Sequence, residues 1–146
     1  MNRFVLYGLV ATVLIGGVAV AADALFVSER EELEQLASDL TQRDGDERID
    51  AVLRWTDPSR EPVTLTRGRD VQRFEEQDDY ALAEGLGDAL APFDASDLDV
   101  VQRSVRIDGD RATVAVRVRA AGELHDASLR LARSGQGWLV TDVRTR

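Results

Sequence analysis

The clearest hydrophobic pattern lies at the N-terminus, where Phe4–Ala22 form an apolar run without a single charged side chain. The run has 19 residues, close to the ~20 that a helix needs to cross a bilayer. A short basic start, Met1–Arg3, precedes it, and Asp23 interrupts it on the other side. The pattern predicts that residues 1–27 are a targeting segment, either a signal anchor or a signal peptide.

The two fates of this segment lead to different locations. The length of the run favours an uncleaved single-pass anchor, because the apolar core of a signal peptide usually has ~7–15 residues. Ala19-Val20-Ala21 has the small-x-small pattern of a cleavage site, so the alternative is a secreted or periplasmic protein cleaved near Ala21. Arg3 before the run and acidic residues after it place the N-terminus in the cytoplasm. We therefore expect an inner-membrane protein whose residues 28–146 lie outside the cytoplasm, in the periplasm.

Helical periodicity marks three segments of residues 28–146. A capping-box pattern at Ser28–Glu31 begins an amphipathic helix that runs to about Thr41. A second, short helix contains the apolar face of residues 49–53. A third follows the acidic stretch Glu75–Asp79 and ends at Pro92.

Alternation of apolar and polar residues predicts six strands, because successive side chains of a strand point to opposite faces. The last four are joined by short turns and must form an antiparallel meander. Its apolar face includes Val114, Val116 and Val118 and needs a cover, which the three helices supply. The sequence therefore predicts an α+β domain over residues 28–146. The predicted strands cover residues 62–66, 70–74, 98–107, 111–119, 125–131 and 138–145.

This order of helices, short hairpin, helix and closing meander resembles the nuclear-transport-factor-2-like (SnoaL-like) superfamily. The resemblance lies in Ser28–Trp55, Asp79–Phe93 and Val101–Arg144, with the closing Gly137-Trp138-Leu139-Val140. The resemblance implies that a curved antiparallel sheet wraps a long helix into a cone, and the apolar run Phe4–Ala22 predicts that this member is membrane-anchored. The interior of such a cone hosts a ligand, a catalytic site or only packed side chains, so the resemblance implies a fold and leaves function open.

Members that resemble this layout include isomerases, dehydratases and cyclases that use Asp, His and Tyr inside the cone. This chain has few histidines and tyrosines for such a site, because His125 is the one histidine and Tyr7, one of two tyrosines, lies in the apolar run. The candidate catalytic set is His125 as acid/base with Tyr80 or Asp142 as its partner. The neighbouring Asp126 points to the opposite face, so spacing supplies no group to orient His125. The alternative is a half-solvated histidine near a strand end.

The composition narrows the chemistry further. The net charge of −9 makes nucleic acid an unsuitable partner, because an acidic domain repels phosphate backbones. The absence of cysteine excludes disulfides, zinc–thiolate sites and thiol catalysis. The acidic stretch Glu75–Asp79 lacks the spacing of a calcium loop and is typical of a solvated helix start. The sequence predicts no cofactor and no metal site.

Arginines, which account for all 18 basic residues, recur on the outward faces of the last strands. Aligned strands would gather them into a basic stripe that binds an acidic partner or anionic lipid headgroups. The alternative is a solvated face paired with local carboxylates. The candidate interaction face comprises Arg111, Arg117, Arg119 and Arg130, with Arg103 and Arg133 on neighbouring strands.

These patterns predict a membrane-tethered accessory or interaction domain outside the cytoplasm that performs no catalysis. Its expected partners are the membrane and either a protein or a small apolar ligand. The alternative is a small-molecule-binding protein or an isomerase- or dehydratase-type enzyme that uses the interior of the cone. The inner side of the sheet discriminates between them, since an enzyme needs an open pocket there with His125, Tyr80 and a carboxylate together.

Overall fold

The computed structural model describes residues 29–42, 44–135 and 137–146. The chain divides into two units, Met1–Glu32 and Leu33–Arg146, and the second contains the fold. The predicted anchor or signal peptide, residues 1–27, lies outside the described residues. Within the part of the chain that the structure describes, no helix is long and apolar enough to cross a membrane.

The predicted α+β class is confirmed, because the described residues form three α-helices packed on one sheet of six strands. The first helix covers residues 29–42 of the described chain. The remaining elements are α2 (Gly45–Leu53), β1 (Val63–Arg67), β2 (Asp70–Phe74), α3 (Asp79–Leu90), the short 3₁₀ helix η1 (Ala91–Asp94), β3 (Asp99–Asp108), β4 (Arg111–Ala120), β5 (Glu123–Ser134) and β6 (Gly137–Thr145).

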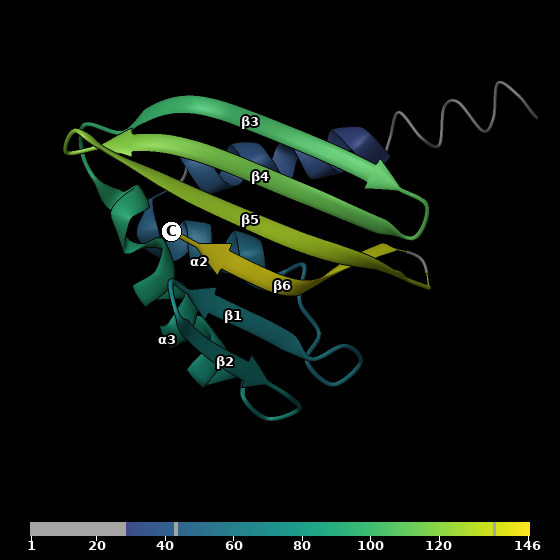
Figure 1. The fold of residues 1–146 in the computed structure, drawn as a ribbon. Coiled ribbons are helices and arrows are strands. Elements are labelled where there is room, and N and C mark those ends of the chain that lie inside the picture. The colour runs from purple at the N-terminus through teal and green to yellow at the C-terminus, as the bar shows by residue number, and fades with distance from the viewer. Residues whose placement is uncertain (1–28, 43, 136) are drawn as a thin grey trace, which may run out of the picture. The chain divides into compact units, whose positions relative to one another are not determined.

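The strands lie in the order β2-β1-β6-β5-β4-β3 (Figure 1). The predicted antiparallel meander β3–β6 is confirmed, as is the β1–β2 hairpin. The prediction of a wholly antiparallel sheet is wrong at one place, where β1 pairs with β6 in parallel and Leu65 lies opposite Val143. A parallel pair needs a long crossover connection, and the chain between β1 and β6 supplies one.

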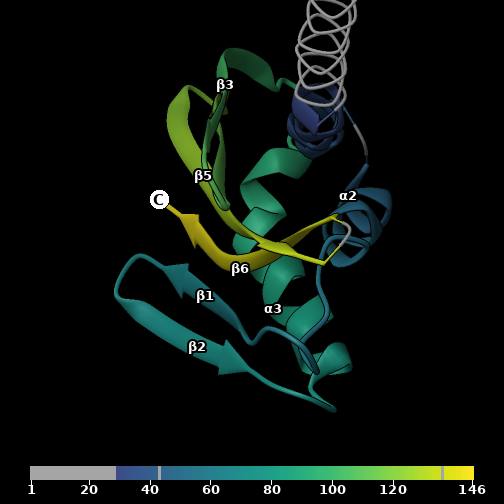
Figure 2. The same ribbon diagram turned by 90° about the vertical axis from the view of Figure 1, so that its right-hand side faces the viewer.

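The helices cover one face of the meander, called here the inner face, and the opposite face is called the outer face (Figure 2). The prediction that Val114, Val116 and Val118 face the core is confirmed, because they are 0–2% exposed. The same core cluster contains Leu33, Leu36 and Leu40 of the first helix, Leu82, Leu86 and Leu90 of α3, and Ala127, Leu129 and Leu131 of β5.

One arginine belongs to this buried side. Arg48 of α2 is 3% exposed, and its Nε donates to the Leu40 carbonyl at 2.9 Å. Its Nη2 donates to the Phe93 carbonyl at 2.9 Å, and its Nη1 pairs with Asp94. The side chain therefore satisfies a carbonyl in the last turn of the first helix and joins that helix to α2 and η1.

Candidate functional site

The outer face of the meander brings charged side chains from several strands into one row. Arg106 of β3 lies opposite Thr113 of β4, Thr113 lies opposite Arg130 of β5, and Arg130 lies opposite Asp142 of β6. Arg111 precedes Thr113 by two residues on β4 and so points to the same face. Figure 1 looks onto this face, with the helices behind the sheet. Three arginines from three strands thus surround one threonine.

A hollow of about 860 Å³ lies over this row, within the ~300–1,000 Å³ usual for ligand sites. Three arginines, three carboxylates and two threonines contribute its polar lining. These residues are Arg106, Arg111, Arg130, Glu61, Asp108, Asp142, Thr113 and Thr141.

The three arginines of the hollow, Arg106, Arg111 and Arg130, have no ion pair with any residue that the structure describes. Asp142, the carboxylate opposite Arg130, is held instead by Arg144, whose Nε donates to Asp142 Oδ1 at 2.9 Å. The hollow therefore presents three guanidinium groups whose donors are available to an anion. We call Arg106, Arg111 and Arg130 the arginine triad.

Other outer-face arginines are paired. Arg117 lies opposite Asp126, and its Nε and Nη2 donate to the two carboxylate oxygens at 2.6 and 3.1 Å. The hydrogen bond from Arg117 lowers the pKa of Asp126 below its ordinary value, against a smaller opposing effect of burial. Arg119 Nη1 lies 3.8 Å from Asp99 Oδ2. These pairs leave the triad as the basic part of the face that is open to a partner.

A second hollow, of about 300 Å³, lies on the next row of the same face. Register places Ser104 of β3, Ala115 of β4 and Ser128 of β5 side by side, and all three line the hollow. Their small side chains explain why the surface is low here, between the triad and the Arg117–Asp126 pair.

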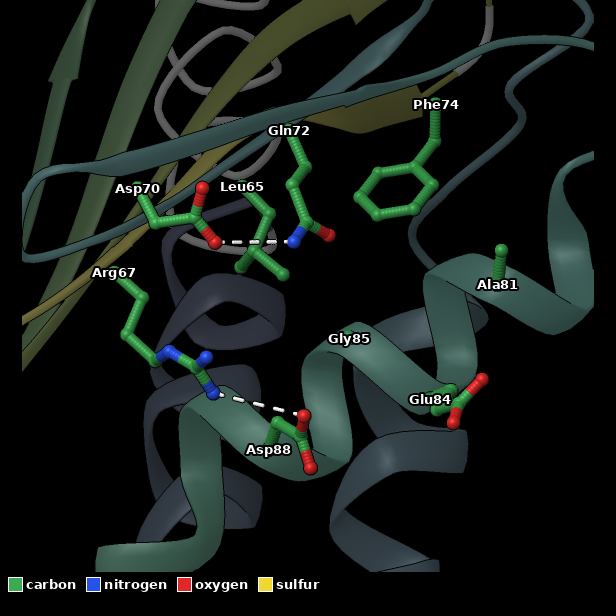
Figure 3. A pocket seen from close by; sticks show the side chains of 9 residues that line it. All are labelled: Leu65, Arg67, Asp70, Gln72, Phe74, Ala81, Glu84, Gly85 and Asp88. Carbon is green, nitrogen blue, oxygen red and sulfur yellow. Dashed lines mark hydrogen bonds and ion pairs between the residues drawn. The ribbon is translucent and has the colours of Figure 1, made fainter.

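A further cavity, of about 260 Å³, lies between the β1–β2 hairpin and α3 (Figure 3). Its apolar wall includes Leu65 of β1 and Phe74 of β2, which face α3 at Gly85. A Cβ atom at Gly85 would lie 3.0 Å from Leu65 Cδ2 and 3.3 Å from Phe74 Cζ. The glycine therefore allows the hairpin to approach the helix closely.

The polar wall of this cavity is mainly acidic. Arg67 Nη1 lies 3.6 Å from Asp88 Oδ2, and Gln72 Nε2 donates to Asp70 Oδ2 at 3.0 Å. Glu84 also lines the cavity and is exposed. Three carboxylates beside one arginine suit a small polar molecule that carries hydrogen-bond donors.

The three candidate catalytic residues lie in different places. Tyr80 is 84% exposed in the first turn of α3. His125 is half-buried at inward parity on β5, opposite Val118. Asp142 lies on the outer face, opposite Arg130. The structure therefore does not bring Tyr80 and Asp142 together with His125 on the inner face, and neither His125 nor Tyr80 lines any of the three hollows.

A β-bulge explains the position of Asp142. Trp138 and Val140 are buried on the inner face, so strict alternation would also turn residue 142 inward. The register shifts between Arg130 and Leu131, which leaves Thr141 as an extra residue on β6. A bulge of this kind reverses the faces beyond it, so Val143 is buried and Asp142 points outward.

Two arginines of the predicted basic stripe, Arg103 and Arg133, lie on the inner face and not on the outer face. Arg103 lies opposite the buried Val116, and Arg133 lies opposite the buried Trp138, with its guanidinium 4.4 Å from the indole ring. Both share the inward parity of apolar neighbours on their own strands. By contrast, Arg111, Arg117, Arg119 and Arg130 occupy the outer face, and whether they bind a partner stays a prediction.

Sequence reasoning missed one member of the triad. Arg106 alternates with Val105 and Ile107, two residues that pack against the core, and this pattern alone indicates an outward side chain. Thr141 also lines the hollow, but its spacing in the sequence does not indicate this, because its position depends on the bulge in β6.

The described residues contain no group of three or more His, Asp or Glu side chains that could hold a metal ion. Asp70, Glu84 and Asp88, the acidic residues that line the cavity between the hairpin and α3, do not form such a group.

Comparison with solved protein structures identifies the fold. No protein-family model matches the chain, and no curated protein matches it significantly. An NTF2-like protein with a cystatin-like fold from Novosphingobium aromaticivorans matches with a TM-score of 0.56 and 15% identity over 86% of each chain. A predicted ketosteroid isomerase from Shewanella frigidimarina matches with a TM-score of 0.55 and 17% identity, over 80% of this chain and 92% of its own.

An NTF2-like protein of unknown function from Shewanella baltica matches with a TM-score of 0.54 and 10% identity, over 83% of this chain and 94% of its own. Identities this low carry the fold and no activity. The described part of the chain has the nuclear-transport-factor-2-like fold, as the order of its elements predicted.

Proposed function

We propose that this protein is a non-catalytic interaction domain, tethered to the inner membrane by Phe4–Ala22 and positioned in the periplasm, that docks a protein partner on the outer face of its meander. The tether keeps the domain close to the bilayer, where its partner lies. The excess of acidic residues outside the meander keeps the domain soluble.

One observation carries the proposal: three arginines without an ion pair in the described part of the chain gather around one hollow on an open sheet face. Folding does not require this arrangement, because the core lies on the other side of the same strands. Unpaired guanidinium groups that converge from three strands are suited to bidentate recognition of carboxylates.

The non-catalytic part of the proposal is supported by the dispersal of the candidate acid/base groups. General acid–base catalysis needs a side chain within hydrogen-bond reach of the reacting atom and a second group that orients it. His125, Tyr80 and Asp142 lie on β5, α3 and β6, with one half-buried, one exposed and one on the outer face.

The docking part can be tested by site-specific photocrosslinking of the full chain in its own membranes. A benzoylphenylalanine at Ser104, exposed on the outer face of β3, is expected to give one adduct of defined mass. The matched control is the same substitution at Tyr80, an exposed aromatic on α3, which is expected to give none. Absence of an adduct at Ser104, or the same adduct from Tyr80, would overturn outer-face docking.

The tether has its own test. The full chain is expected to sediment with membranes and to resist extraction by high salt, and removal of residues 1–27 is expected to release it. Recovery from the periplasm at a reduced mass would instead establish the secreted alternative, with cleavage near Ala21.

A second candidate function rests on the cavity between the hairpin and α3. Its volume of about 260 Å³ is just below the ~300 Å³ lower limit usual for ligand pockets, so it suits a small polar molecule. A ligand bound there would raise the Tm of the wild-type protein. The same ligand would not raise the Tm of the Ala81→Trp variant, because the larger side chain would occupy the cavity that Ala81 lines.

A further inference from the structure

The arginine triad also indicates the chemistry of the partner. We propose that the hollow framed by Arg106, Arg111 and Arg130 binds the side-chain carboxylates of an acidic, extended segment of a partner protein. This inference rests on the proposed interaction function and specifies what that function recognises.

The meander and the rest of the described domain carry net charges of opposite sign. Residues 99–146, which contain the meander, hold nine arginines and six acidic residues, whereas residues 29–98 hold eight arginines and twenty acidic residues. The meander is thus the basic part of an acidic protein. An anionic partner is attracted to this part and repelled by the remainder, so charge selects the binding face.

The geometry of the triad suits carboxylates. Each guanidinium offers a planar fork of donors that matches the two oxygens of a carboxylate. Thr113 lies between Arg106 and Arg130 in the row, and its hydroxyl adds a donor at the centre. The Thr141 hydroxyl is engaged at 3.3 Å with the Arg130 carbonyl and borders the hollow from β6.

The size of the hollow favours a chain segment over a single ion. A volume of about 860 Å³ is far larger than the ~30 Å³ occupied by one water-sized group. Alternate side chains of an extended segment are ~7 Å apart, which is also the spacing of Arg111 and Thr113 along β4. Successive carboxylates of such a segment can therefore meet successive positions of the hollow.

The acidic residues of the hollow favour a protein segment over an anionic membrane. Glu61, Asp108 and Asp142 lie among the arginines, and Glu61 and Asp108 are exposed. A continuous layer of lipid phosphates would face these carboxylates as well as the arginines. Discrete carboxylates on a peptide can contact the arginines and avoid the acidic positions.

The test uses the full chain in detergent micelles and a fluorescein-labelled peptide of alternating Glu and Thr residues. Fluorescence polarisation is expected to show binding that weakens as salt rises, and the matched Gln-Thr peptide is expected not to bind. Removal of one charge-assisted contact is worth about 1.5 kcal/mol, so Arg106→Gln, Arg111→Gln and Arg130→Gln should each weaken binding about tenfold.

Arg103→Gln is the matched control, because Arg103 is an exposed arginine on the same strand as Arg106 but at inward parity. It is expected to change the affinity by less than about twofold. The triad residues have no ion pair within the described chain, so their Gln variants are expected to retain the wild-type Tm, which calorimetry checks. A Tm that falls in all three variants would contradict their placement outside the fold's own contacts.

Several results would overturn the inference. These are no binding at ~1 mM peptide, equal binding of the Gln-Thr peptide, or equal weakening by Arg103→Gln. Triad-dependent binding to vesicles of anionic lipid without binding to the peptide would assign the site to a membrane, and triad-dependent dimers in sedimentation would assign it to a second copy of this chain.

The photocrosslinking test separates this inference from the proposed function. Ser104 lies outside the triad hollow. If the adduct at Ser104 persists when all three triad arginines are changed to Gln, the domain docks a partner and the triad is not its recognition site. If the adduct is absent from the wild-type protein, the proposed function itself fails.

Discussion

The two faces of strands β4 and β5 carry opposite kinds of side chain, although one backbone builds both. On the inner face, Val114 and Leu129 are 0% exposed and belong to the core. On the outer face of the same strands, Arg111, Thr113 and Arg130 border an open hollow. Burial of apolar area stabilises the inner face, whereas the arginine triad has no ion pair within the described chain. The fold therefore explains the first set of residues and leaves the second free for recognition.

The largest effect should come from cutting a side chain of the inner face. Leu129→Ala removes buried methyl groups and leaves a cavity, so we expect a loss of about 3–4 kcal/mol in the free energy of unfolding. Ser128→Ala is the control, because it changes the adjacent outer-face residue and should stay within about 0.5 kcal/mol. Urea unfolding followed by tryptophan fluorescence measures both. Similar losses in the two variants would show that both faces contribute to the core.

Arg48 sharpens the comparison, because it is an arginine on the buried side. Arg48→Met leaves the Leu40 and Phe93 carbonyls without their donor, and we expect a loss of about 2–3 kcal/mol. Arg130→Met, which removes an unpaired outer-face arginine, should change stability by less than about 0.5 kcal/mol. The same urea titration compares them. Equal effects would contradict the assignment of one arginine to the fold and the other to binding.

The inner face could be predicted from the sequence because alternation is a local property of a strand. Val114, Val116 and Val118 needed only their own spacing to be placed in the core. The same rule, applied to Arg103, Arg106 and Arg133, would have separated the outer triad from the two inward arginines.

Features that depend on distant segments could not be predicted in this way. The outward turn of Asp142 depends on a bulge opposite Arg130 and Leu131, and no local residue type marks it. The parallel pairing of β1 with β6 joins segments far apart in the chain. The burial of Arg48 depends on carbonyl groups of Leu40 and Phe93, which only the folded chain brings to it. The membrane tether stays a prediction.

Arg103 tests the edge of the sheet, where the contrast between the faces is weakest. β3 has a strand neighbour on one side only, and an inward-pointing charge on such an edge opposes pairing with another chain. Arg103→Val should therefore increase concentration-dependent self-association, measured by sedimentation velocity, while changing unfolding stability by less than about 0.5 kcal/mol. Arg103→Lys keeps the charge and should remain like the wild type. An Arg103→Val variant that stays monomeric would show that the charge does not protect the edge.

The smallest effect concerns the paired part of the outer face. Because Arg117 lowers the pKa of Asp126 in the folded protein, the pair stabilises the fold above the ordinary carboxyl pKa of ~3.9. That contribution is lost as pH falls through the lowered value, since protons then bind the unfolded chain preferentially. Urea titrations from neutral to strongly acidic pH should show a shallower acid decline for Asp126→Asn than for the wild type. Asp108→Asn on the same face reports the change in net charge alone, and identical slopes in the two variants would remove any special role for the pair. The difference should be small because an exposed pair is screened by water, in keeping with an outer face that contributes little to folding.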